Sequence, residues 1–254
     1  MTTKRILNLC VFVLVLLAAF TLNGENAETI LKMVDETNYG SKAPADTEMT
    51  MVMKIHKGSS VKTRELKAWT KNNSDAEDWR VMKFLSPADV AGIGLLVKAE
   101  NQMYLYLPEF RRIRRIASST KKNSFQGSDF SYHDLDPVDF SGSYHAKLKA
   151  EDEKTWLLEL DRKETADRPY EKILLTVDKT NYMFLMMETY DKNGDIWKKM
   201  TNEIKAAGKY YVICRTRIED KKKGSHTTLE MKDIKVDQGI DNTVFTQRYL
   251  KRKE

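Results

Sequence analysis

Apolar and polar residues alternate along most of this chain, with the period of two that is typical of half-buried β-strands. The first such run places four apolar residues on one face of a strand: Met49, Met51, Met53 and Ile55. Similar runs, bounded by turn residues, follow one another closely. Strands are predicted at 47–56, 61–70, 79–85, 95–100, 102–107, 143–150, 155–161, 172–177, 183–190, 196–206, 210–219 and 227–236.

Consecutive strands joined by short turns predict one antiparallel sheet, and a sheet of this length must curl or close. The dipeptide Asn193-Gly194 between two strands is a strong hairpin signal. Helices are few: one is expected at 27–39, capped by Asn26, and a short closing helix is expected after Asp241. The predicted fold class is therefore mainly β (α+β). The pattern alone leaves a curved sheet, a barrel and a sandwich open.

The first residues have the pattern of a secretory signal peptide. Lys4 and Arg5 precede an apolar stretch at 6–22, and a polar run follows it. We therefore expect a signal peptide at 1–24 and one exported domain at 25–254. Because about 17 apolar residues are also at the short limit for a membrane span, an uncleaved anchor is the alternative.

The charge and the cysteine content limit the classes of protein that this sequence fits. The net charge of +6 is mild and spread along the chain, which, together with the export signal, disfavours nucleic-acid binding. Beyond the signal region Cys214 is the only cysteine, so no internal disulfide can form and the core alone must stabilise the fold. Cys214 lies in an apparent strand, where we expect it to be a small buried hydrophobe.

The residues that usually carry catalysis are sparse. No two of the four histidines have the spacing of metal ligands on one element. Ser131, His133 and Asp134 are the nearest approach to a catalytic triad, but neighbours in one segment cannot easily stack as nucleophile, base and orienting group. We expect Asp129, Ser131 and Asp134 to cap turns instead. The sequence predicts no catalytic residues, no metal site and no cofactor.

The apolar residues include more candidates for a functional site than the polar residues do. Methionine is a flexible, polarizable residue that suits surfaces fitting variable apolar ligands. One interpretation is that the methionines and the other apolar residues pack a sheet against its helices. The other is that a subset of them lines a cavity for acyl chains. The candidates for such a cavity are Met49, Met51, Met53, Ile55, Trp79, Met103, Leu105 and Met187.

The segment 104–135 combines a strand with a dense group of arginines. Its sequence LPEFRRIRRI is followed by SFQGSDFSYHDL. Four arginines within five residues repel one another and need water, carboxylates or an anionic partner. They are either a solvated face or a site for a lipid headgroup, a lid or a protein partner. The candidates for this second role are Arg111, Arg112, Arg114, Arg115, Asp129 and Asp134.

These two motifs resemble the signature of the outer-membrane lipoprotein-sorting proteins, relatives of the periplasmic carrier LolA. The resemblance extends from AETILKMVDE to DNTVFTQRYL, over most of the expected exported domain. It implies one strongly curved antiparallel sheet that forms an incomplete β-barrel, with short helices covering its open side.

The resemblance also implies a function. It predicts a periplasmic, non-enzymatic carrier of acylated lipoproteins on their way to the outer membrane, with an inner-membrane transporter and an outer-membrane acceptor as partners. One alternative is a carrier of free lipid that works with a membrane transporter. Another is a periplasmic or surface module that binds protein and has a filled interior. A monomer without nucleic acid is expected in each case.

Reversing the charge of two of these arginines tests their role. Arg112→Glu combined with Arg114→Glu should impair cargo handling, because an anionic partner would be repelled. The melting temperature should hardly change, since solvated surface substitutions usually alter stability by less than about 0.5 kcal/mol. Thermal unfolding and lipid uptake, measured on the same preparations, separate the effects. A loss of folding would show that the arginines are structural.

Overall fold

The computed structural model describes residues 26–73, 78–98, 102–136 and 139–252. The predicted signal peptide at 1–24 therefore lies outside the described residues. In the described part of the chain, no helix is long and apolar enough to cross a membrane.

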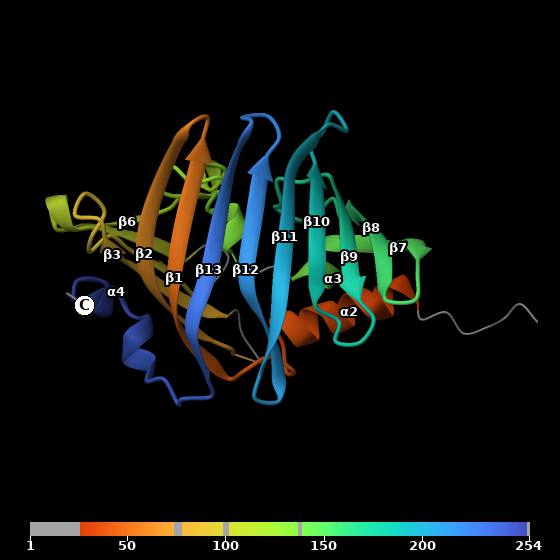
Figure 1. The fold of residues 1–254 in the computed structure, drawn as a ribbon, viewed down its shortest axis with the longest axis horizontal. Coiled ribbons are helices and arrows are strands. Elements are labelled where there is room, and N and C mark those ends of the chain that lie inside the picture. The colour runs from red at the N-terminus through yellow and green to blue at the C-terminus, as the bar shows by residue number, and fades with distance from the viewer. Residues whose placement is uncertain (1–25, 74–77, 99–101, 137–138, 253–254) are drawn as a thin grey trace, which may run out of the picture.

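Thirteen strands form one antiparallel sheet, which confirms the predicted fold class (Figure 1). The first strand pairs with the last, so the sheet runs in the order β6-β5-β4-β3-β2-β1-β13-β12-β11-β10-β9-β8-β7. Its edges are β6 and β7, which do not pair, and the sheet stays open between them. The strands are β1 Asp46–Lys57, β2 Ser60–Lys71, β3 Trp79–Ser86, β4 Gly94–Val97, β5 Met103–Leu107, β6 Arg112–Arg115, β7 Tyr144–Glu151, β8 Thr155–Arg162, β9 Lys172–Asp178, β10 Phe184–Tyr190, β11 Ile196–Ala207, β12 Tyr210–Asp220 and β13 Ser225–Val236.

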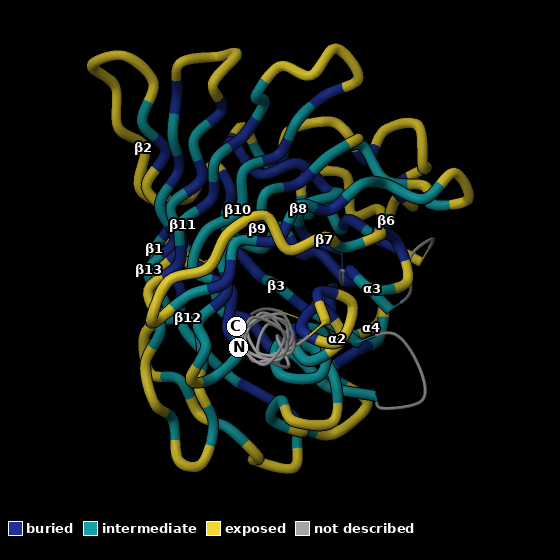
Figure 2. Tube along the Cα trace, turned by 90° about the vertical axis from the view of Figure 1, so that its right-hand side faces the viewer, coloured by how far each residue is buried: buried dark blue, intermediate teal, exposed yellow. Residues whose placement is uncertain are grey.

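The predicted alternation in β1 is confirmed. Met51, Met53 and Ile55 are buried on the inner, concave face, and Met49 packs against them at its margin. Residues directly opposite one another in an antiparallel pair share a face, so the register with β2 places Leu66 and its neighbours on the same side. Figure 2 shows buried stretches in the middle of many strands and exposed residues in the hairpin loops at both ends.

Two segments cover this inner face. Helix α2 (Ala27–Asn38) begins with Asn26 as its cap and buries Ile30, Leu31 and Val34 completely. The chain between the two edge strands supplies the second cover, which we call the inner loop (residues 116–136). Its buried apolar side chains are Ile116, Phe125, Phe130, Tyr132 and Leu135. Beyond it, the short helix α3 (Phe140–Ser143) leads into β7.

The outer face carries a second, smaller apolar cluster. Trp69, Val81 and Leu96 project outward there and are covered by Phe245 and Leu250 from the C-terminal segment. That segment forms the 3-10 turn Asn242–Phe245 and helix α4 (Gln247–Leu250). Asp241 accepts a hydrogen bond from the amide of Thr243 at 2.7 Å, so its predicted capping role is confirmed.

Strand β6 was not predicted. After β5, Pro108–Phe110 form a 3-10 turn and Arg111 adopts a left-handed conformation with φ of 50°, which returns the chain along β5. The arginine-rich sequence conceals the strand because it has almost no apolar alternation. Charged side chains are common on edge strands, where they hinder pairing with another chain.

The prediction for Cys214 was wrong. The residue is only half-buried, and it lies where the register between β11 and β12 shifts. A β-bulge leaves one residue out of the regular alternation, so the apolar run around Cys214 does not place it in the core.

The C-terminal segment should stabilise the sheet through Phe245. Because this ring is fully buried against the outer face, Phe245→Ala should lower the free energy of unfolding by about 3–5 kcal/mol. Chemical denaturation measures the change. Gln247→Ala, an exposed change two residues away, should change stability by less than about 0.5 kcal/mol. Equal stabilities for the two variants would show that the segment is not docked.

Candidate functional site

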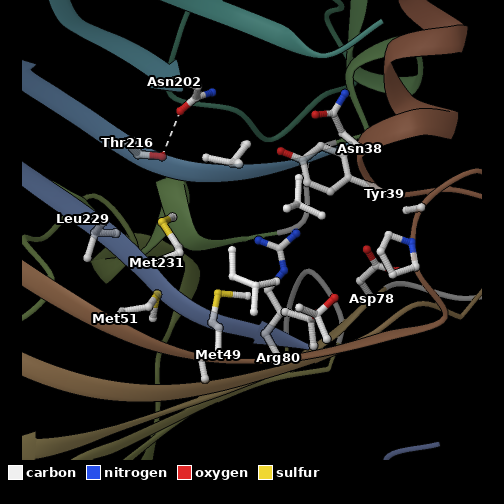
Figure 3. A pocket seen from close by; sticks show the side chains of 18 of the residues that line it. Asn38, Tyr39, Met49, Met51, Asp78, Arg80, Asn202, Thr216, Leu229 and Met231 are labelled. Atoms are coloured by element: carbon white, nitrogen blue, oxygen red, sulfur yellow. Dashed lines mark hydrogen bonds between the residues drawn. The ribbon is translucent and has the colours of Figure 1, made fainter. Parts of the chain in front are cut away.

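A cavity of about 290 Å³ lies inside the curved sheet, next to the C-terminal end of α2 (Figure 3). Strands β1, β2 and β3 line one side, and β10 to β13 line the other. The surface is mostly apolar, with Phe130, Leu135 and Phe184 among its residues. Six methionines line it: Met49, Met51, Met82, Met183, Met200 and Met231. Such a lining can adapt to apolar chains of different shape.

The strand register arranges the cavity from a polar to an apolar end. Thr47, Thr70 and Arg80 form one row across β1, β2 and β3 on the inner face. The next row inward is Met49, Ala68 and Met82, and the one after it begins with Met51. Rows on one face are about 7 Å apart, because each residue of a strand rises about 3.3 Å. Polarity therefore falls within one or two rows.

Two arginines on the inner face hold the inner loop. Arg64 of β2 is buried, donates a hydrogen bond to the carbonyl of Gln126 and lies 5.7 Å from the ring centre of Phe84. Arg80 of β3 donates to the carbonyl of Leu135 at 3.4 Å. The guanidinium of Arg80 also faces the ring of Tyr39, which follows α2, at 5.4 Å. Arg80 thus contacts both segments that cover the cavity.

Two buried carboxylates anchor the same loop to the sheet. Asp129 accepts hydrogen bonds from the hydroxyls of Ser225 and Thr227 on β13, at 2.5 and 2.7 Å. Asp134 forms an ion pair with Lys198 of β11 at 2.5 Å and accepts a bond from the hydroxyl of Tyr170. Although burial raises its pKa, the charge of Lys198 and these hydrogen bonds hold the pKa of Asp134 below its usual range. The ionised form therefore fastens the loop.

Ser131, His133 and Asp134 do not form a catalytic triad in the described structure. The hydroxyl of Ser131 donates directly to Asp134 at 2.7 Å, and the amide of Ser131 donates to the same carboxylate. Asp134 therefore caps the turn, as predicted. Burial lowers the pKa of His133 to about 4, so this imidazole is neutral at neutral pH.

A smaller cavity of about 60 Å³ lies beside the first. Tyr39, Phe184 and Met200 line both spaces, and Met187 and Tyr170 line only the smaller one. The two cavities therefore adjoin at these three shared residues.

Comparison with known proteins identifies the family. A family model described as "Uncharacterized protein" matches residues 76–252, which is more than half of the chain. An outer membrane lipoprotein-sorting protein domain, so named, from Vibrio parahaemolyticus superposes with a TM-score of 0.81 at 26% identity, covering 89% of this chain and 98% of that one. The chain belongs to the family that this model describes, and it shares the LolA-like fold of the outer-membrane lipoprotein-sorting proteins.

Two further solved structures agree with this assignment. A DUF1329 family protein from Desulfovibrio piger ATCC 29098 has a TM-score of 0.81 at 25% identity, covering 88% of this chain and 97% of that one. A LolA superfamily protein from Nitrosomonas europaea shares the fold with a TM-score of 0.70 at 19% identity, covering 89% and 100% of the two chains. No curated protein matches the chain in sequence.

The structure of this LolA-like chain places seven of the eight cavity candidates on the inner face. Met49 and Met51 line the larger cavity and Met187 lines the smaller one. The other four pack in the core that continues from the cavity wall: Met53, Ile55, Met103 and Leu105.

Trp79 is the exception, because it lies on the outer face. Its ring packs against Phe245 at 5.9 Å, in the outer apolar cluster. Alternation in β3 turns its neighbours Arg80 and Met82 inward instead. Sequence reasoning missed Met183, Met200 and Met231. Leu229 and Met231 alternate with Glu230 and Lys232, so the period of two could have found Met231.

The arginine cluster, Arg111, Arg112, Arg114 and Arg115, lies outside the cavity and is exposed. Arg112 and Arg114 stand opposite Leu107 and Leu105 and share the inner face, whereas Arg115 stands opposite Tyr104 on the outer face. The charge of Arg114 opposes the rise in pKa that burial causes at Tyr132 of the inner loop. The cluster therefore borders the opening of the sheet beside the inner loop.

Asp35 of α2 gives the helix a pH-dependent attachment. Its carboxylate accepts hydrogen bonds from the amides of Phe140 and Ser141 at the start of α3, at 3.0 and 2.7 Å. Burial raises the pKa of Asp35 from 3.8 to about 6, although these amides oppose the rise. Because the folded protein holds this proton more tightly, the contribution of Asp35 to stability is full below about pH 4 and is lost as the pH rises through 6.

Asp35→Asn should remove this dependence. Relative to the variant, the natural protein should lose up to about 3 kcal/mol between pH 4 and 7, at about 1.4 kcal/mol for each unit of pKa shift. Denaturant unfolding of both proteins across this range gives the difference, and any constant offset from the amide is cancelled. A difference that does not vary with pH, or that grows in the opposite direction, would show that the two amides outweigh burial.

Proposed function

We propose that this protein is a periplasmic carrier that binds acyl chains in its inner cavity and carries them towards the outer membrane, without catalysing a reaction. The methionine-lined cavity under two covering segments carries the proposal. The name of the Vibrio parahaemolyticus domain, a lipoprotein-sorting protein, supports acylated lipoproteins as the cargo. The signal-peptide pattern of the first residues supports export, and hence the periplasm, as the location.

The cavity volume suits a cargo that must be released. A space of 290 Å³ equals roughly ten water molecules at about 30 Å³ each. If it took about ten methylene groups, their burial would contribute roughly 8 kcal/mol at about 0.8 kcal/mol each. That corresponds to micromolar affinity before the costs of binding. A full 16-carbon chain would need the covering segments to move, which limits the net affinity further.

The contacts of the covering segments provide such a movement. Arg80 joins the inner loop to Tyr39 through a long hydrogen bond and a cation–π contact, both of which are weak individually. We propose that these contacts break when cargo enters, whereas Asp129 and Asp134 keep the rest of the inner loop bound to the sheet. Arg80, which lines the cavity, is therefore our candidate for the arginine that controls the cover.

We assign a different role to the arginine cluster. Its residues border the opening of the sheet, where an inner-membrane transporter or an outer-membrane acceptor could dock by charge complementarity. Docking beside the inner loop would place a partner next to the segment that must move. Because the cluster does not line the cavity, it lies too far out to hold a headgroup inside it.

A free lipid is the second candidate cargo. The observation that favours it is the polar end of the cavity, where Asp78 and Arg80 place opposite charges close to the methionine rows. A lipid headgroup would fill such a place, with its chains directed inward. A protein-binding module with a filled interior is less consistent with the cavity.

Native mass spectrometry of the exported protein, purified without detergent, tests the proposal directly. Organic extraction should release a bound lipid or acylated peptide, which also names the cargo class. A bare protein mass that shows no uptake of added lipid or lipopeptide would refute the carrier function.

A charge placed among the methionines should abolish acyl binding. Met51→Asp puts a carboxylate in the apolar part of the cavity, where it lacks a partner, so the affinity for a fluorescent fatty acid should fall at least about tenfold. The matched control, Val61→Asp, adds the same charge at an exposed position and should bind normally. If Met51→Asp fails to fold, Met49→Trp fills the cavity without a charge and should reduce uptake similarly. Normal uptake by a folded Met49→Trp variant would place the chain elsewhere.

A further inference from the structure

The polar end of the cavity has an unusual balance of hydrogen-bonding groups. Asn38, Asn72, Asp78 and Arg80 all line it, together with the threonine row described above. In the view of Figure 3 the ring of Tyr39 lies between Asn38 and the guanidinium of Arg80, and Asp78 lies on the Arg80 side of that ring. These residues come from α2, β2 and β3, so several elements build this end of the cavity.

Two amide oxygens in this place have no partner among the described residues. The side-chain nitrogen of Asn38 donates to the carbonyls of Val34 and Tyr182, at 2.8 and 3.3 Å, so the orientation of the amide is fixed. Its oxygen is buried without a hydrogen bond. Asn72 repeats the arrangement: its nitrogen donates to the carbonyl of Gly40 and its buried oxygen accepts nothing. Buried acceptors of this kind are costly unless a donor reaches them.

Asp78 adds a third acceptor, with a charge. Its carboxylate receives one long hydrogen bond from the amide of Asn73, at 3.4 Å. Arg80 follows two residues later, in β3, and its guanidinium contacts the carbonyl of Leu135 and the ring of Tyr39. This end of the cavity therefore combines a guanidinium, a carboxylate and the side chains of two asparagines in its lining.

We infer that this polar end binds a phosphoethanolamine headgroup, with the phosphate on Arg80 and the primary ammonium among Asp78, Asn38 and Asn72. Arginine binds phosphate through several N–H donors, and an ammonium supplies three donors for three acceptors. The acyl chains then point inward, over the row of Met49 and Met82. This inference rests on the proposed carrier function and specifies the cargo as a phospholipid with an aminoethyl headgroup.

The test compares headgroups that differ in the number of N–H donors on the ammonium, and one headgroup that has no ammonium. A fluorescent fatty acid is displaced from the protein by dihexanoyl lipids carrying phosphoethanolamine, its mono- and dimethyl derivatives, phosphocholine or phosphoglycerol. Displacement should weaken with each added methyl group, and phosphoethanolamine should be preferred to phosphocholine by about tenfold, which is about 1.4 kcal/mol. This series uses the unaltered protein, so its result does not depend on whether a variant folds.

Asp78→Asn should reduce that preference to about threefold or less, because the ammonium loses its counter-charge. The matched variant Asp89→Asn removes a carboxylate at an exposed position outside the cavity and should keep the preference of the unaltered protein.

Three results would overturn the inference. Equal displacement by phosphoethanolamine and phosphocholine would leave the carrier function intact and refute the headgroup assignment. Stronger displacement by phosphoglycerol would show that the site reads the anion and not the ammonium. Failure of the fluorescent fatty acid itself to bind would refute the carrier function, and the headgroup assignment with it.

Discussion

The structure depends on covering the inner face of a sheet that does not close. Because β6 and β7 remain unpaired edges, the strands alone cannot exclude water from the apolar side chains that alternation directs inward. Helix α2 and the inner loop must do so, and the inner loop is the chain that connects the two edges. Loops are rarely buried, since their backbone polar groups need partners. Here Arg64 and Arg80 supply two of these partners from side chains of the sheet.

The anchors of the inner loop differ in how firmly they hold. The Asp134–Lys198 pair is almost completely buried, and removing one member of such a pair typically costs about 3–5 kcal/mol, since the other charge is left uncompensated. Asp129 is held by two hydroxyl donors. Arg80, by contrast, makes one long hydrogen bond and an aromatic contact. A loop fixed firmly to β11 and β13 but weakly near the cavity can move locally at one end without detaching from the sheet.

Much of the fold could be predicted from the sequence, for a definite physical reason. A strand with one buried face must alternate, so runs such as Met49 to Ile55 identify both a strand and its inner side. The same rule failed at β6, because an edge strand made of arginines buries too little to show the period. It also misplaced Trp79 as a cavity residue, since the outer face of this sheet is apolar too, where the C-terminal segment covers it. A sheet with apolar clusters on both faces gives a tryptophan two buried environments, and only the register distinguishes them.

The candidate site was harder to predict from the sequence than the fold. Arg80 is a single arginine within an ordinary strand, whereas the arginine cluster attracts attention by its density. The role of Arg80 follows from position: it faces inward in a row with Thr47 and Thr70, where α2 and the inner loop end. The same geometry explains why the cavity has a direction. Residues near the strand ends meet solvent and loop backbone and can be polar. Two rows further in, the side chains pack in the apolar core, as Phe84 does against Phe125 of the inner loop. An amphipathic molecule fits such a gradient in one orientation only, with its polar group beside the residues that hold the cover. Entry of the headgroup would therefore compete with the weak contacts of Arg80, and binding and opening would involve the same side chain.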